Sequence, residues 1–159
     1  MKKRLIIAMN MLAFSAFLVS CGGQAENETS ENAPESMIEE TEEYDANRGI
    51  GKFDETNVKL GALDAAMATK GESIAGTKCT SCHKLTDEKL VGPGWAGVTE
   101  RRTPHWIMNF ITNPDPMIDK DPEVQAQLEL CLVRMPNQSL TDDDARSIVE
   151  FMRKNDGTK

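Results

Sequence analysis

The sequence has 159 residues, a hydrophobic fraction of 39% and a formal net charge of −8. This length allows one ordinary domain with appendages, and the low hydrophobic fraction indicates that part of the chain lies outside a packed core. The acidic balance argues against a nucleic-acid partner, because binding to phosphates requires clustered Lys and Arg.

The first 20 residues have the form of a secretory signal peptide. Three basic residues at positions 2–4 precede an apolar run over residues 5–19, which is shorter than the roughly 20 residues of a membrane-spanning helix. The segment Leu18-Val19-Ser20-Cys21 resembles the bacterial lipobox, and this resemblance implies cleavage before Cys21 and attachment of lipid to its thiol. An ordinary signal peptide followed by an incidental cysteine is the alternative.

An acidic segment follows the signal peptide. Residues 22–47 contain nine acidic residues and no basic ones. Such a segment buries too little apolar surface to offset the entropy lost on ordering. We therefore predict a flexible acidic linker over residues 21–58, a disordered tether for a structured domain over residues 59–159. A docking role for the acidic run is the alternative.

Four helices and no strand are predicted in the domain. They are expected over residues 62 or 64 to 78, residues 103–112, residues 121–133, and from residue 141 onward. The second and third each begin with a capping residue followed by proline, and Thr141 with Asp144 comes close to a capping box for the last. Gly71 lies inside the first helix at a cost of about 1 kcal/mol relative to Ala, which predicts close packing against another helix.

The chemistry of the chain centres on Cys79-Thr80-Ser81-Cys82-His83, the Cys-x-x-Cys-His pattern of covalent haem c attachment. Two thiols three residues apart can reach the two vinyl groups on one porphyrin edge, and the adjacent imidazole is then placed under the iron. A thioredoxin-like redox pair would require a βαβ context, which is missing. A zinc site would require a second pair of ligands, for which His105 and Cys131 are left.

From about Met67 to Asn155 the sequence resembles the class I cytochromes c. The matching features are the glycine-containing helix before the Cys–His motif, the segment 90–93, Met135-Pro136 and an amphipathic last helix. The whole chain is similar to small lipoprotein cytochromes of Gram-negative bacteria, some of which are associated with nitrous-oxide reductase systems. The resemblance implies an all-α fold, with three to four helices wrapped around one covalent haem and its iron, and the first and last helices crossing near Gly71. It also implies that the Pro93 carbonyl accepts the ring N–H of His83 and strengthens it as an iron ligand.

Met135 is the predicted second iron ligand, because it lies in a loop before the last helix and a thioether favours ferrous iron. Met135 as core packing is the alternative, and Met117, in a Pro-rich loop, and Met108 are rivals. His105 would give a bis-histidine site, although its position near a helix start is more typical of a surface histidine.

Several other side chains are assigned possible roles. Cys131 is expected to be a buried structural thiol, with redox sensing as the alternative. Trp95 and Trp106 either line the haem crevice or belong to the core, and Asn137 is a candidate to steady the ligand loop. Arg101 and Arg102 either neutralise a haem propionate or are solvated. A weakly basic ring at the haem edge, or scattered surface charge, is predicted from Lys78, Lys84, Lys89 and Arg134.

With His83 and Met135 both on the iron, no coordination position is open to a substrate. The predicted function is therefore an electron carrier, not an enzyme, with no small-molecule substrate. It would pass electrons from a quinol-oxidising membrane complex to a terminal reductase or oxidase in respiration. The chain would be held by lipid on Cys21 in the envelope of a Gram-negative bacterium, with its domain in the periplasm. A haem-based gas or redox sensor with a displaceable sixth ligand is the alternative, and a peroxidase would usually require a second haem motif.

Overall fold

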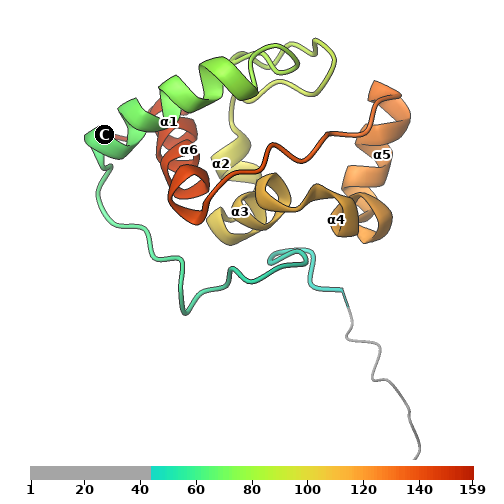
Figure 1. Ribbon diagram of the computed structural model, residues 1–159, viewed down its shortest axis with the longest axis horizontal. Coiled ribbons are helices and arrows are strands. Elements are labelled where there is room, and N and C mark those ends of the chain that lie inside the picture. Colours follow the sequence, from blue (N-terminus) through green and yellow to red (C-terminus); the bar gives the residue numbers. More distant parts are fainter. Residues whose placement is uncertain (1–43) are drawn as a thin grey trace, which may run out of the picture. The chain divides into compact units, whose positions relative to one another are not determined.

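The computed structural model describes residues 44–159, in which six helices are connected by turns and loops and no strand occurs (Figure 1). The helices are α1 (Ala65–Lys78), α2 (Val98–Arg101), α3 (Pro104–Thr112), α4 (Pro114–Lys120), α5 (Pro122–Cys131) and α6 (Asp142–Asn155). None of the helices in this part of the chain is long and apolar enough to span a membrane. The predicted signal peptide, the lipid site Cys21 and the linker up to residue 43 lie outside the described residues.

The four predicted helices begin within the expected bounds, and three of them begin at the capping residues named in the sequence. The Asp64 carboxylate accepts the amide N–H groups of Ala66 and Met67 at the start of α1. Thr103 and Asp121 cap α3 and α5 in the same way. At α6 the Thr141 hydroxyl and the Asp144 carboxylate form a full capping box, so Asp replaces the usual Glu. These caps satisfy amide donors that would otherwise have no partner within the helix.

Two helices were not predicted, and both are short. α2 has only 4 residues. α4 begins at Pro114, directly after α3 ends, with Asn113 as the boundary of both helices. The sequence Asn113-Pro114 predicts a helix end followed by a Pro-rich loop. Proline is equally suited to the first position of a new helix, so the same dipeptide ends one helix and starts the next.

α1 and α6 pack against each other at Gly71, as predicted. A Cβ atom at Gly71 would lie 2.0 Å from the Ser147 carbonyl oxygen, which leaves no room for any side chain. Small and aliphatic residues on both helices complete the contact, and Ala68, Ala75, Ala145 and Val149 are each 0% exposed. The close approach of the two backbones fixes the end of α1, from which the Cys–His motif extends.

Residues before position 59 pack against the helices. Residues 44–58, predicted as linker, pack along α3 and α4, and we call them the N-terminal strap (Figure 1). Phe53 and Val58 of the strap are buried, and the Asn109 amide of α3 bonds both the N–H and the C=O of Phe53, each at 2.9 Å. The sequence does not indicate this packing, because single apolar residues in a polar sequence give no periodic signal.

Candidate functional site

The Cys79–His83 segment forms a tight turn directly after α1. The amide N–H groups of Cys82 and His83 both donate to the Cys79 carbonyl at 3.0 Å. Both thiols are free, with Cys79 buried and Cys82 half-buried, and burial raises the pKa of Cys79 to about 11. Residues 44–159 contain no cluster of three or more His, Cys, Asp or Glu that could hold a metal ion, so the zinc alternative finds no support there.

The His83 ring is oriented by a backbone carbonyl. Its Nδ1 lies 2.8 Å from the Pro93 oxygen, as the family resemblance implied. Because a carbonyl only accepts hydrogen bonds, Nδ1 carries the proton and Nε2 keeps a free lone pair. Burial lowers the pKa of His83 and thereby favours the neutral imidazole, which is the form that binds a metal.

Gly92 is a site residue that the sequence analysis named only as part of the segment 90–93. A Cβ there would lie 2.4 Å from Cε1 of His83, so the imidazole packs directly on the glycine backbone. On a neighbouring side, the Trp95 ring lies 5.8 Å from the His83 ring, centroid to centroid, and also contacts Phe151. Trp95 therefore belongs to the surroundings of His83. The only sequence feature that could have indicated a role for Gly92 is its position directly before Pro93 in the segment 90–93.

The loop between α1 and α2 folds back to place these groups. The Gly92 and Val91 amides donate to the Cys82 carbonyl at 2.8 and 3.2 Å, and the Trp95 amide donates to the Lys84 carbonyl at 2.9 Å. These bonds bring the Pro93 carbonyl beside the histidine ten residues earlier in the chain.

Met135 is half-buried, packs against the core and is held on both sides. Arg134 pairs with Asp115 at 3.1 Å and Asp119 at 3.0 Å, which ties the segment to α4. The Asn137 amide donates to the Thr112 carbonyl at 3.1 Å, at the end of α3. The predicted role of Asn137 in steadying this loop thus agrees with its contacts.

Two lysines join the histidine and methionine segments. Lys78, directly before Cys79, donates to the Gln138 carbonyl at 2.9 Å, and Lys89 donates to the Leu130 carbonyl at 2.7 Å. The other two members of the predicted basic ring are neutralised within the domain, since Lys84 pairs with Glu88 and Arg134 pairs with α4. Surface charge at this edge is therefore weaker than a basic ring would supply.

The rival iron ligands belong to the packed interior. Met117 is 0% exposed and lies in α4, not in a loop, where it contacts the strap at Gly49. Met108 is 3% exposed within α3. His105, expected on the surface, is buried at 7% exposure.

The remaining candidates have partners of their own. The Trp106 indole N–H donates to Asp121 at 3.0 Å, and Arg102 lies over the Trp106 ring at 4.3 Å, so Trp106 is a core residue. Arg101 donates to the Ala96 carbonyl at 2.8 Å. Cys131, expected to be buried, is half-buried at the end of α5.

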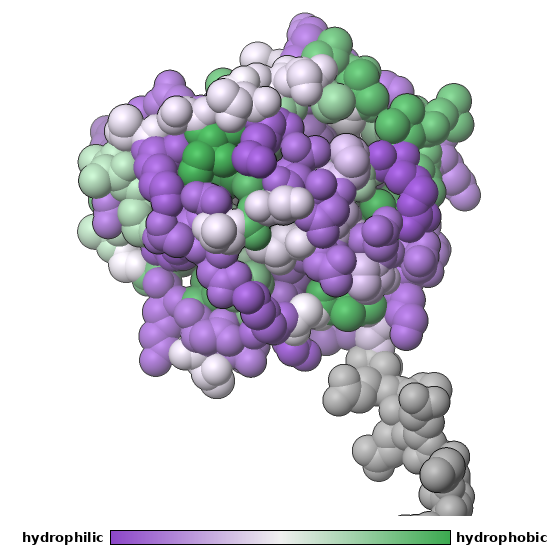
Figure 2. All heavy atoms as spheres, in the orientation of Figure 1, coloured by the Kyte–Doolittle hydropathy of each residue, from purple (hydrophilic) through white to green (hydrophobic). Residues whose placement is uncertain are grey.

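The surface beside these groups is unusually apolar. Large hydrophobic side chains are exposed on both segments that carry the candidate ligands, namely Leu85, Leu90, Val91, Leu130, Leu132 and Val133. Figure 2 shows hydrophobic residues gathered at the top and upper right of the molecule, over the loop after α1 and the end of α5. Exposed apolar area costs about 25 cal/mol per Å², and a flat apolar ligand would cover it. The free thiols, the free Nε2 and this apolar rim fit a covalently bound haem.

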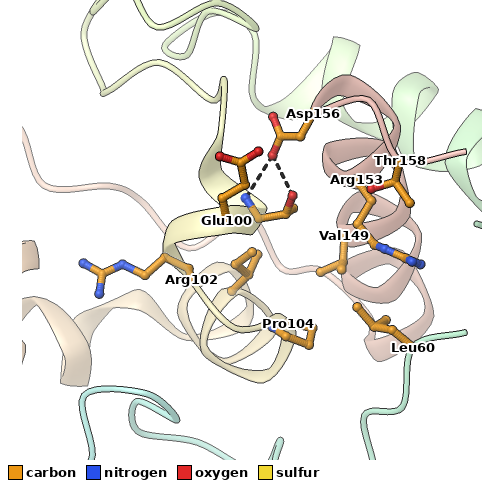
Figure 3. Close-up of a pocket in the computed structure, with 10 residues that line it drawn as sticks. Leu60, Glu100, Arg102, Pro104, Val149, Arg153, Asp156 and Thr158 are labelled. Atoms are coloured by element: carbon orange, nitrogen blue, oxygen red, sulfur yellow. Dashed lines mark hydrogen bonds between the residues drawn. The ribbon is translucent and has the colours of Figure 1, made fainter.

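A separate pocket of about 200 Å³ lies between α2 and the C-terminal part of α6 (Figure 3). The Asp156 carboxylate at its edge accepts from the Thr99 amide at 2.9 Å and from the Thr99 hydroxyl at 2.7 Å. Arg153, also in its lining, pairs with Glu150. None of its lining residues comes from the Cys–His or methionine segments.

Comparison with known proteins gives a consistent result. Residues 68–156 match the family model of cytochrome c. The solved cytochrome c from Rhodothermus marinus is 37% identical, with a TM-score of 0.62, and the match covers 70% of this chain and 92% of that one. An engineered form of that cytochrome, Rma TDE, is 36% identical with a TM-score of 0.61, over 70% and 93% of the two chains. A search of curated protein sequences found no match.

Proposed function

Because the chain belongs to the cytochrome c family, we propose that it is a membrane-tethered electron carrier in which His83 and Met135 ligate one haem iron. The fold is that of a single-haem class I cytochrome c, the cofactor is covalently bound haem c, and the general function is electron transfer. The ligand assignment, the anchor and the redox partners are the proposed part.

Each residue of the site has a distinct proposed role. Cys79 and Cys82 bind the haem vinyl groups through thioethers. His83 supplies Nε2 to the iron, while the Pro93 carbonyl holds the proton on Nδ1 and makes the ring a stronger donor. Met135 would supply a thioether sulfur as the second protein ligand of the iron. The haem iron supplies a one-electron redox centre, and the thioether ligand raises its potential.

The observation that carries this proposal is the His83–Pro93 hydrogen bond beside two free thiols. It leaves one imidazole nitrogen available next to the two attachment points of a covalent haem. The half-buried Met135, braced by Arg134 and Asn137, is the sulfur ligand best placed to serve the same site. With His83 and Met135 both bound, the haem iron would carry electrons and would leave no position for a substrate.

The proposed partners are a quinol-oxidising membrane complex as donor and a terminal reductase or oxidase as acceptor. Support comes from the apolar rim. Any part of it that the haem does not cover would be an exposed apolar patch, and such patches mark sites of protein–protein contact. Two of the four flanking cations are paired with acids, so we expect docking to depend only weakly on ionic strength.

The anchor is proposed as lipid on Cys21, with the domain in the periplasm of a Gram-negative bacterium. Its support is the lipobox-like sequence before that cysteine. The variant Cys21→Ser should leave the haem spectrum unchanged and move the cytochrome from the membrane to the soluble fraction. A variant that still sediments with membranes would exclude this anchor.

The ligand assignment is tested with Met135→Ala. We expect loss of the weak charge-transfer band of the iron–sulfur bond, a lower reduction potential and new binding of carbon monoxide to the reduced protein. Met117→Ala tests the rival ligand and should not abolish the band, because Met117 is a core residue. Carbon monoxide binding by the unchanged protein would instead favour the sensor alternative. A band that is lost in Met117→Ala but kept in Met135→Ala would refute the assignment.

A further inference from the structure

One buried carboxylate joins the N-terminal strap to two helices. Asp121 is 1% exposed, and its Oδ1 accepts the amides of Glu123 at 2.8 Å and Val124 at 3.0 Å, at the start of α5. Its Oδ2 accepts the Trp106 indole N–H of α3 at 3.0 Å and the Tyr44 hydroxyl of the strap. One charged group thus connects the strap, α3 and α5. Burial raises the pKa of Asp121, but the four hydrogen bonds lower it by more than burial raises it. The pKa therefore lies below its usual value.

The strap also packs against α4. Gly49 adopts a φ of +71° and packs against Met117 of α4, where a Cβ would lie 2.5 Å from the methionine Cε. The same glycine approaches Trp106, with its Cβ position 3.3 Å from Cδ1. The Thr103 hydroxyl at the start of α3 donates to the Asn47 carbonyl. These contacts join the strap to α3 and α4 along its length.

α4 and α5 in turn carry the methionine segment. The two helices pack against each other and meet at Asp121, which ends one and caps the other. Arg134, next to Met135, is bound to α4 through Asp115 and Asp119. The strap therefore reaches Met135 through a short series of direct contacts. By contrast, His83 is held by Pro93, Gly92 and Trp95, all of which lie in the loop after α1.

We propose that the N-terminal strap is a positioning element for the sixth iron ligand. The strap holds α4 and α5 where Met135 reaches the iron, so release of the strap weakens the methionine–iron bond without disturbing haem attachment or the His83 ligand. This inference rests on the proposed assignment of Met135. Tyr44 and Asp121 are positioning residues, because they act through α5 and touch neither the haem nor its ligands.

The test uses the full-length, haem-loaded protein and two strap variants. Tyr44→Phe removes one hydroxyl and keeps the ring. Gly49→Val introduces a β-branched residue at positive φ against Met117. Gly157→Val is the matched control, because Gly157 also has a positive φ of +89° but nothing lies within 4 Å of its Cβ position. All variants are measured where far-UV circular dichroism shows full folding.

The readouts are the iron–sulfur band, the reduction potential and the affinity of ferric protein for added imidazole, which competes with Met135. Loss of one charge-assisted hydrogen bond should raise imidazole affinity about tenfold in Tyr44→Phe. The potential should fall, and Gly49→Val should show the same changes. Gly157→Val should match the unchanged protein in all three.

Outcomes separate this inference from the ligand assignment. If Met135→Ala loses the band but Tyr44→Phe leaves imidazole affinity and potential unchanged, the strap does not position the ligand. If Met135→Ala keeps the band, the ligand assignment itself is wrong. Should Gly49→Val fail to fold, the isosteric Tyr44→Phe decides alone. An equal loss of thermal stability in both strap variants with no change at the iron would show a purely structural strap and overturn the inference.

Discussion

The crossing of α1 and α6 can be tested with two glycines on one helix. At Gly71 a methyl group would lie 2.0 Å from the Ser147 carbonyl oxygen and 2.9 Å from the Ile148 nitrogen, whereas ordinary contact begins at 3.4 Å. Both obstacles are backbone atoms of α6, which cannot rotate away. Gly71→Ala therefore forces the helices apart, while Gly76→Ala, later in α1, meets nothing within 4 Å.

The two variants should change the free energy of unfolding in opposite directions. Overpacking at Gly71 costs about 3 kcal/mol, against about 1 kcal/mol that Ala gains over Gly within a helix, so the net loss is about 2 kcal/mol. This corresponds to a drop in melting temperature of about 10 °C for a domain of this size. Gly76→Ala meets no obstacle and should be more stable by up to about 1 kcal/mol.

The assay is urea unfolding of the haem-loaded protein, followed by circular dichroism and by haem absorbance. The covalent haem stays attached in both states, so the comparison measures helix packing and not haem loss. If Gly71→Ala were as stable as Gly76→Ala, the two backbones would not be in the close contact described, and the reasoning would fail.

Two further predictions concern buried carboxylates. For Asp121, burial raises the pKa, but hydrogen bonds from Tyr44, Trp106 and the α5 amides outweigh it and hold the pKa below its usual value. Ionised Asp121 therefore stabilises the fold above about pH 4, and this stabilisation is lost as pH falls through the lowered pKa. The difference in urea midpoint between the unchanged protein and Asp121→Asn should shrink from pH 7 to acid; a constant difference would contradict this. Glu150 is 0% exposed and pairs with Arg146 at 2.6 Å and Arg153 at 2.8 Å, so Glu150→Ala should cost about 3–5 kcal/mol in urea unfolding by leaving two guanidinium groups unpaired. The exposed Glu72, paired with Lys154, is its control, and a similar loss in Glu72→Ala would count against the explanation.

The sequence predicted those features that depend on local chemistry. Caps such as Thr103 and Thr141 act within three residues, so they indicate helix starts without knowledge of the fold. The Cys–His motif has the same local character. The His83–Pro93 bond spans ten residues and was expected only through the family resemblance, because no local rule joins the two positions.

What the sequence did not predict depends on long-range contacts. Asn109 gives no sign in the sequence that its amide will bond Phe53, 56 residues earlier. Tyr44 lies in an acidic run whose composition indicates disorder, yet its hydroxyl reaches a carboxylate 77 residues away. Such bonds form only because folding creates a buried acceptor, and composition averaged over a segment does not register them.

The strap changes how the acidic segment is understood. Composition assigned all of residues 21–58 to a flexible linker. Net charge alone, however, does not distinguish a flexible segment from one that packs against the helices of its own domain. The strap contributes few apolar side chains, chiefly Phe53 and Val58, and relies on hydrogen bonds to Asn109 and Asp121. Each of those bonds is made to a side chain that is at least 99% buried, where an unpaired polar atom is most costly. The strap therefore also stabilises the helices, since its removal would break three hydrogen bonds that the buried Asn109 amide makes with strap backbone atoms. A polar segment can thus be an integral part of a domain when it satisfies buried groups that the rest of the chain leaves open.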